Sequence, residues 1–105
     1  MPRVTIVRYT TKPGCAQENE ALSRAVYGEL RRETPPHIAY ALFRGGDEFL
    51  HLFVNTRDDS SDPVTELPTF KAFQKGILSR CVEPPQATRV SLDLIDGYGL
   101  AMPDA

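Results

Sequence analysis

His51 is the side chain of this sequence best suited to acid–base chemistry. It stands between Phe49 and Phe53 in an apolar run, and an unperturbed imidazole titrates at about pH 6.5. Burial lowers the pKa of a histidine, so a buried His51 is a neutral base that can take a proton from a weakly acidic hydroxyl. The alternative is a core histidine whose two nitrogens are satisfied by backbone groups or water. The apolar neighbours fit both interpretations.

Four aromatic side chains can complete a site around such a base. Tyr9 and Tyr40 lie in β-type runs, where a tyrosine hydroxyl can orient a substrate oxygen, although its ordinary role is to bury its ring and leave its tip in water. Phe70 and Phe73 stand at helical spacing, which is typical of core side chains and also of a pocket wall. We therefore treat His51 as the candidate catalytic residue and these four as candidate substrate-binding residues.

Three arginines offer a weaker alternative for binding. Arg8, Arg44 and Arg89 can each clamp an anionic oxygen through paired hydrogen bonds. Arginines near strand ends more often pair with an acid, such as Asp93, or remain solvated.

The sequence predicts neither a metal nor a cofactor. The histidines and cysteines, His37, His51, Cys15 and Cys81, lack paired ligand spacing. Two cysteines are also too few for a disulfide framework, which favours a reducing cytoplasm. A Cys15–Cys81 disulfide stays an open alternative, because the predicted topology brings both residues to one end of the sheet.

Length and composition limit the class of protein. The chain has 105 residues, of which 41% are hydrophobic and 25% charged, as in an ordinary globular domain. Twelve basic and fourteen acidic side chains give a net charge of −2, so no basic field attracts nucleic acid or anionic lipid. The apolar runs fall short of the roughly 18 residues that span a bilayer. We expect one domain over residues 1–105, with no nucleic-acid or membrane partner.

The first half of the chain predicts a strand, a helix and a hairpin. Residues 4–10 are rich in β-branched side chains and have the length of a strand. Residues 16–32 predict a helix, which the prolines at 35 and 36 end. Its apolar face comprises Leu22, Ala25, Val26 and Leu30. Residues 37–44 and 49–55 predict two strands of a hairpin, joined by the four residues 45–48.

The second half predicts a helix and a final strand. Residues 68–82 form the helix, and residues 88–95 alternate apolar and polar side chains as a strand does. The apolar stripe of this helix comprises Phe70, Phe73, Ile77, Leu78 and Cys81. The order βαββαβ predicts an α+β, ferredoxin-like domain, in which two helices cover one face of a four-stranded antiparallel sheet. We expect a folded core over residues 3–96 and a tail over 97–105.

Both faces of the predicted hairpin are apolar. The alternating sets are Ile38, Tyr40 and Leu42 against Ala39, Ala41 and Phe43, and Phe49 and Phe53 against Leu50, Leu52 and Val54. A sheet with helices on one side and water on the other reads half polar, so the second face also needs a cover. We expect a homodimer that forms through the sheet faces and closes a dimeric α/β barrel.

Three stretches carry a resemblance to a known family. They are residues 4–14 (VTIVRYTTKPG), which lead into a helix containing Glu18 and Asn19, residues 49–54 (FLHLFV) and residues 67–73 (LPTFKAF). On these the sequence resembles the dimeric α/β-barrel superfamily and, within it, the antibiotic biosynthesis monooxygenase-like (ABM-like) proteins. Residues 70–85, which end in CVEPP, are similar to those of small bacterial members whose function is not established.

The resemblance implies a pocket between sheet and helices, which different members use for cofactor-free oxygenation of aromatic polyketides, quinol oxidation or haem degradation. Haem-degrading members carry an Asn in the first strand, and a Trp and a His around the second helix. Here Val7 falls near the Asn position, residues 70–82 lack His, and the chain has no Trp. We therefore do not expect haem degradation.

Two functions stay open at this point. One is a cofactor-independent monooxygenase or oxidoreductase that acts on a small aromatic or quinol-like substrate, with His51 as base and Tyr9 and Tyr40 as orienting groups. The other is a non-catalytic dimeric module that binds a small apolar or aromatic ligand or has a structural role. A cavity with His51 or a tyrosine hydroxyl directed into it favours the first.

Overall fold

A computed structural model describes residues 2–57 and 62–99 of the chain. Its elements are β1 (Arg3–Thr10), α1 (Ala16–Glu33), β2 (Ile38–Gly45), β3 (Glu48–Asn55), α2 (Pro68–Lys75), α3 (Ile77–Arg80) and β4 (Gln86–Ser91). The strands form one antiparallel sheet in the order β2-β3-β1-β4. This is the α+β, ferredoxin-like fold predicted from the sequence.

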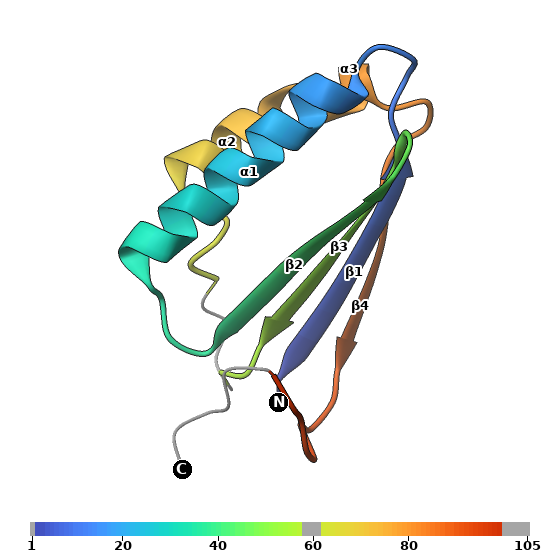
Figure 1. The fold of residues 1–105 in the computed structure, drawn as a ribbon. Helices are drawn as coiled ribbons and strands as arrows, with labels where there is room; N and C mark the ends of the chain where they lie inside the picture. Colours follow the sequence, from blue (N-terminus) through green and yellow to red (C-terminus); the bar gives the residue numbers. More distant parts are fainter. Residues whose placement is uncertain (1, 58–61, 100–105) are drawn as a thin grey trace.

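The helices cover one face of the sheet (Figure 1). Side chains alternate between the two faces of a strand, so residues paired across strands share a face. The helix-facing positions form three rows, Tyr9–Phe49–Arg44, Val7–His51–Leu42 and Thr5–Phe53–Tyr40. His51 thus faces the helices, a point that the alternation in the sequence leaves open.

The hydrophobic core lies between this face and the helices. Phe49 of β3 is completely buried, and Val26 of α1 and Phe73 of α2 are buried in the same cluster. Leu22 and Leu30 of α1 pack against the cluster as predicted. Ala25, predicted on the same helix face, is exposed.

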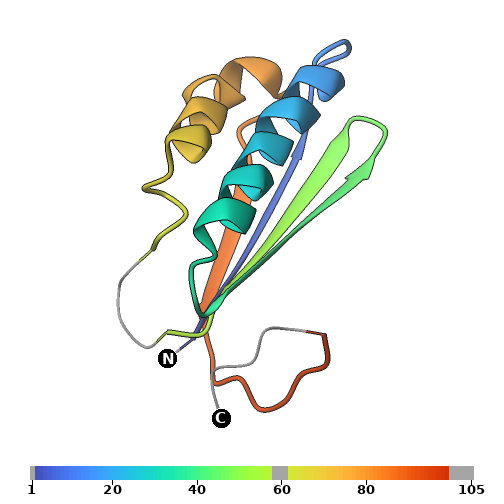
Figure 2. The ribbon, with the colours of Figure 1, turned by 60° about the vertical axis from the view of Figure 1, so that its left-hand side comes forward.

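The opposite face of the sheet carries no helix of the described residues (Figure 2). On this face Phe43 of β2 is 57% exposed and Val90 of β4 is 40% exposed, while Leu50 and Leu52 of β3 are half-buried. The second apolar face predicted from the sequence therefore lies open in the single chain. Within the described ranges, none of the helices combines the length and apolar composition that a bilayer crossing requires.

The helix predicted over residues 68–82 is interrupted at Gly76. α2 ends at Lys75, and α3 spans only Ile77–Arg80. Gly76 has φ −116° and ψ 11°, outside the α-helical region, and glycine is the residue least committed to that region. The break changes the direction of the side chains that follow, so Leu78, predicted on the buried stripe, is 66% exposed.

The ends of two other predicted segments also differ. The hairpin turn has two residues, Gly46 and Asp47, because Gly45 pairs with Glu48, and Gly46 takes the positive φ of 61° that such turns need. β4 lies at Gln86–Ser91 instead of 88–95, because its partner β1 begins at Arg3, opposite Ser91. Of the predicted tail, residues 100–105 lie outside the described residues.

We expect Phe49→Ala to lower the free energy of unfolding by about 3 to 5 kcal/mol, because it leaves a cavity in the middle of the core. Urea denaturation measures this change. The control Leu78→Ala removes an exposed side chain and should change the stability by less than about 1 kcal/mol. Equal losses in the two variants would contradict this placement of the core.

Candidate functional site

His51 is held between two tyrosine hydroxyls. Tyr9 Oη of β1 lies 2.7 Å from His51 Nε2, and Tyr40 Oη of β2 lies 3.1 Å from His51 Nδ1. Strand register produces this arrangement: Val7 and Leu42 pair with His51, and each tyrosine lies two residues along its strand from one of these, on the same face. Three neighbouring strands thus each contribute one member.

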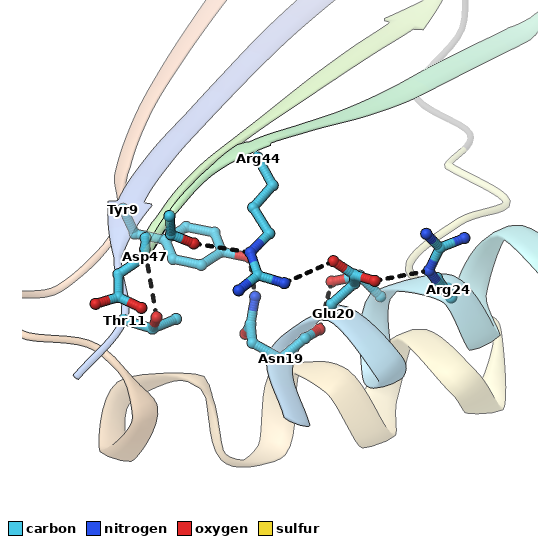
Figure 3. Close-up of polar contacts among 9 residues, drawn as sticks. Tyr9, Thr11, Asn19, Glu20, Arg24, Arg44 and Asp47 are labelled. Carbon is cyan, nitrogen blue, oxygen red and sulfur yellow. Dashed lines mark hydrogen bonds and ion pairs between the residues drawn. The ribbon is translucent and has the colours of Figure 1, made fainter. Parts of the chain in front are cut away.

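Two polar residues from the helices extend the cluster. Asn19 of α1 donates from Nδ2 to Tyr9 Oη at 2.8 Å, and Figure 3 shows its amide directed at the tyrosine. Arg80 of α3 donates from Nε to Asn19 Oδ1 at 3.0 Å and from Nη2 to the Phe73 carbonyl at 2.8 Å. Asn19 is completely buried and Arg80 is 5% exposed. The hydrogen-bonded chain Arg80–Asn19–Tyr9–His51–Tyr40 therefore runs between helices and sheet, and we call it the His51 chain.

Burial sets the protonation state of this chain. It lowers the pKa of His51 to about 4, because a buried imidazolium loses its hydration. Burial raises the pKa of Tyr9 to about 12 and also raises the pKa of Tyr40. At pH 7 the imidazole and both phenols are thus neutral.

A small cavity adjoins the Tyr40 end of the His51 chain. It has a volume of about 120 Å³, and the polar residues Thr5, Asp62 and Thr65 line it together with Tyr40 and His51. We call the side formed by Tyr40 and His51 its polar end. Phe53 and Phe70 contribute apolar walls, and the exposed Arg89 of β4 lies on its solvent side. A larger hollow of about 580 Å³, beside the prolines at 35, 36 and 63, adjoins this cavity and shares Asp62 and Thr65 with it, but no buried acid–base group of the described residues lines the hollow.

All five predicted site residues lie close together in the structure, but only some of them line the cavity. Phe73 packs against the His51 ring, with centroids 5.5 Å apart. His51, Tyr40 and Phe70 line the cavity, whereas Tyr9 and Phe73 lie behind His51 and do not. Both ring nitrogens of His51 are hydrogen bonded to tyrosine hydroxyls. In this arrangement His51 exchanges a proton with a molecule in the cavity only by way of a tyrosine or after one of these bonds opens. Its role as a base stays a prediction.

The three predicted arginine clamps lie apart. Arg8 pairs with Glu48 at an exposed site, and Arg44 pairs with Glu20, which also binds Arg24 (Figure 3). Only Arg89 reaches the cavity. Cys15 and Cys81 are free thiols, and no group of three or more candidate metal ligands gathers in residues 2–57 and 62–99.

Sequence reasoning missed Asn19 and Arg80. Asn19 stands between Glu18 and Glu20, so the local sequence reads as a solvated helix face. The usable signal was spacing, because the buried positions of α1 are Ala16, Asn19, Ser23 and Val26, at steps of three and four residues. In the uninterrupted helix that the sequence predicts, Arg80 would likewise lie two turns after Phe73, on the same stripe.

Solved structures share this fold across nearly the whole chain. The protein Rv0793 of Mycobacterium tuberculosis is 19% identical, with a TM-score of 0.75 over 91% of this chain and 100% of its own. A proposed antibiotic biosynthesis monooxygenase from Nitrosomonas europaea is 14% identical, with a TM-score of 0.74 over 91% and 94% of the two chains. A protein proposed to have the same activity, from Caulobacter crescentus, is 16% identical, with a TM-score of 0.73 over 90% and 91%.

No protein-family model matches the sequence, and no curated protein is significantly similar to it. At these identities the likeness establishes the fold, which is that of the ABM-like proteins. It assigns no substrate and no catalytic residue, because one fold hosts many functions.

The pKa of His51 makes stability depend on pH. Because burial lowers this pKa to about 4, the unfolded chain binds a proton at pH 4–6.5 that the folded protein does not. The stabilisation is therefore complete above about pH 6.5 and is lost as the pH falls toward 4. We expect the unfolding free energy to drop by about 2 to 3 kcal/mol between pH 7.5 and pH 4.5 from this residue alone. Urea denaturation at the two pH values measures it.

Two asparagine variants isolate the contribution of His51. His51→Asn should remove this part of the pH dependence, whereas His37→Asn should retain it. Asparagine suits position 37 because His37 has a φ of 67°, which asparagine tolerates. Identical pH dependence in the wild type and His51→Asn would contradict the neutral state of His51.

Proposed function

We propose that the protein is a cofactor-independent oxidoreductase that oxidises a single-ring quinol with dioxygen. The observation that carries the proposal is a neutral His51, hydrogen bonded to Tyr40 Oη at 3.1 Å, beside a small cavity whose other lining combines apolar side chains with Thr5, Asp62, Thr65 and Arg89. Perturbed acid–base groups beside a cavity favour a functional site. The ABM-like fold is consistent with this chemistry.

The cavity volume limits the substrate. At about 120 Å³ it is close to the roughly 150 Å³ of an engineered apolar cavity that binds benzene. A single aromatic ring fits this space, whereas a fused polyketide does not. Phe53 and Phe70 offer apolar contact to the ring, which leaves its oxygen to the polar end.

The substrate supplies the electrons and dioxygen accepts them, so the reaction requires no bound electron carrier. A dihydroxy ring gives up two electrons and two protons to become a quinone, and dioxygen that takes both becomes hydrogen peroxide. The electron-rich phenolate is the species that gives an electron to dioxygen, so groups that stabilise the phenolate promote the reaction. Tyr40 at the polar end and Arg89 on the solvent side are placed for this. The free Cys15 and Cys81 support a location in a reducing cytoplasm.

The second candidate is a module that binds the same ring without turnover. One observation favours it: both nitrogens of His51 already hold tyrosine hydroxyls, so no bare base faces the cavity. The two functions require the same cavity and differ in whether oxygen is consumed.

We propose further that the open sheet face pairs with a second copy of the chain. Phe43 and Val90 are exposed on this face, at 57% and 40%, and Leu50 and Leu52 lie between them on β3. Burial of such a side chain contributes about 1.5 to 3 kcal/mol, and a second apolar face on a sheet is typically covered. The solved neighbours support the fold that presents this face.

Oxygen consumption tests the oxidoreductase. With a substituted hydroquinone in air, we expect uptake above protein-free buffer and one hydrogen peroxide per quinone formed. Tyr40→Phe should lower kcat/KM by about a hundredfold, because the oxygen loses its hydrogen-bond partner. The matched control Tyr98→Phe alters a fully exposed tyrosine and should leave kcat/KM unchanged. Ligand binding without uptake would reject the oxidoreductase in favour of the binding module.

Analytical ultracentrifugation tests the dimer. We expect the wild type to sediment at twice the mass of 11.7 kDa. Phe43→Asp should raise the dissociation constant at least about tenfold, because it places a charge in an apolar interface. Leu78→Asp alters a side chain that is also exposed, at 66%, but lies on α3; it is the control and should remain dimeric. A wild-type monomer at micromolar concentration would contradict the proposal.

A further inference from the structure

We infer that Asn19 and Arg80 are positioning residues that fix the direction of every hydrogen bond in the His51 chain, so that the hydroxyl proton of Tyr40 is left to face the cavity. Asn19 and Arg80 touch no cavity molecule themselves, since neither lines the cavity. They act through Tyr9 and His51. The inference about proton positions stands independently of the reaction, and only its consequence for the substrate rests on the proposed function.

Arg80 sets which atoms donate and which accept along the His51 chain, starting with its own bond to Asn19. A guanidinium has donors and no acceptor, so the atom of Asn19 that faces Arg80 Nε at 3.0 Å is the carbonyl oxygen Oδ1. Arg80 cannot swing away easily, because it is buried, donates to the Phe73 carbonyl at 2.8 Å and lies over the Phe73 ring at 5.3 Å. The side-chain amide of Asn19 therefore has one orientation.

The orientation of Asn19 decides the state of Tyr9. With Oδ1 directed at Arg80, Nδ2 faces Tyr9 Oη at 2.8 Å and donates to it. The hydroxyl of Tyr9 has a single proton. Ser23 also adjoins this hydroxyl, but it lowers the pKa of Tyr9 against the larger rise from burial, as a hydrogen-bond donor does, so the acceptor left for the proton is His51 Nε2 at 2.7 Å. Tyr9 thus donates to Nε2, which must be the unprotonated nitrogen of the ring.

The position of the single proton on the neutral imidazole then decides which atom donates in the His51–Tyr40 hydrogen bond. A neutral histidine has one protonated nitrogen, so the proton lies on Nδ1 and is donated to Tyr40 Oη at 3.1 Å. Tyr40 accepts this bond and retains its own proton. The neighbouring Tyr27 hydroxyl has no partner within hydrogen-bond geometry among the described residues, and its proximity lowers the pKa of Tyr40 against the larger rise from burial, as a donor does. Tyr27 therefore does not take the proton of Tyr40, which lines the cavity. The proton of Tyr40 is therefore available to a cavity molecule.

The polar end of the cavity is consequently a hydrogen-bond donor. This donor and the Arg89 guanidinium favour an oxygen with negative charge, whereas the Asp62 carboxylate, which also lines the cavity, opposes it. We expect the two donors to outweigh the single carboxylate, so that the site prefers the phenolate form of a phenol over its neutral form.

In the reverse direction Tyr40 donates its proton to His51, and Tyr9 donates to Asn19. Asn19 must then rotate its amide so that Oδ1 faces Tyr9 and Nδ2 faces Arg80 Nε. Two hydrogen-bond donors would face each other there, which is unfavourable. Asn19 and Arg80 together oppose that reversal.

Nitrogen NMR of His51 tests the inference without any ligand. Two-bond proton–nitrogen correlations distinguish a protonated ring nitrogen from an unprotonated one. We expect the Nδ1–H tautomer in the wild type at pH 7. In Asn19→Asp the carboxylate can only accept, so Tyr9 donates to it, His51 donates from Nε2 to Tyr9, and the tautomer becomes Nε2–H. Arg80→Lys retains a donor toward Asn19 and should keep Nδ1–H.

A phenol that changes colour on ionisation provides the second measurement. Bound to the wild type, 4-nitrophenol should show an apparent pKa about one unit below its value in buffer, read from its phenolate absorbance. Bound to Asn19→Asp, it should show no such decrease, whereas bound to Arg80→Lys it should show the same decrease as with the wild type. A purely structural role for Asn19 would weaken binding without changing this pKa.

The outcomes separate this inference from the proposed function. An Nε2–H tautomer or a charged ring in the wild type would overturn the inference, even if Asn19→Asp fails to fold. A folded Asn19→Asp protein that keeps Nδ1–H would overturn it as well. The expected tautomers together with no oxygen uptake would support the inference and reject only the oxidoreductase.

Discussion

The structure depends on the hydrogen bond between Tyr9 and His51, which joins β1 to β3 inside the layer between sheet and helices. Buried polar groups are strongly destabilising when left unpaired. Tyr9 and His51 therefore need each other at 2.7 Å, and Asn19 and Arg80 must then approach from α1 and α3 to complete the set. A polar chain of this kind fixes the relative position of four elements more specifically than apolar packing alone, because each bond requires one geometry.

Alternate side chains of β3 face opposite sides of the sheet and have different roles. On β3, Phe49, His51 and Phe53 face the helices and build core and cavity, whereas Leu50 and Leu52 face the open side. A shift of one residue in register would exchange these sets. The candidate site and the proposed dimer surface thus lie on opposite sides of one sheet, only one residue apart along the chain.

Much of the fold could be predicted from the sequence, because it follows from local patterns. The alternation of residues 37–55 and the proline-bounded helices indicate βαββαβ directly, and the apolar run around His51 singles out this residue. Asn19 and Arg80 could not be assigned, because Asn19 binds Tyr9, ten positions away in the chain, and Arg80 binds Asn19, sixty-one positions away. The helix break at Gly76 was hidden by an apolar stripe that continues across it.

The central claim is that His51 is neutral, protonated at Nδ1 and fixed between a donating Tyr9 and an accepting Tyr40. Neutron diffraction from the protein exchanged into heavy water at pH 7 tests it most directly, because deuterium positions are observed. We expect deuterium on Nδ1 of His51, none on Nε2, and the deuteron of Tyr40 directed into the cavity. Deuterium on Nε2, or on both ring nitrogens, would contradict the claim.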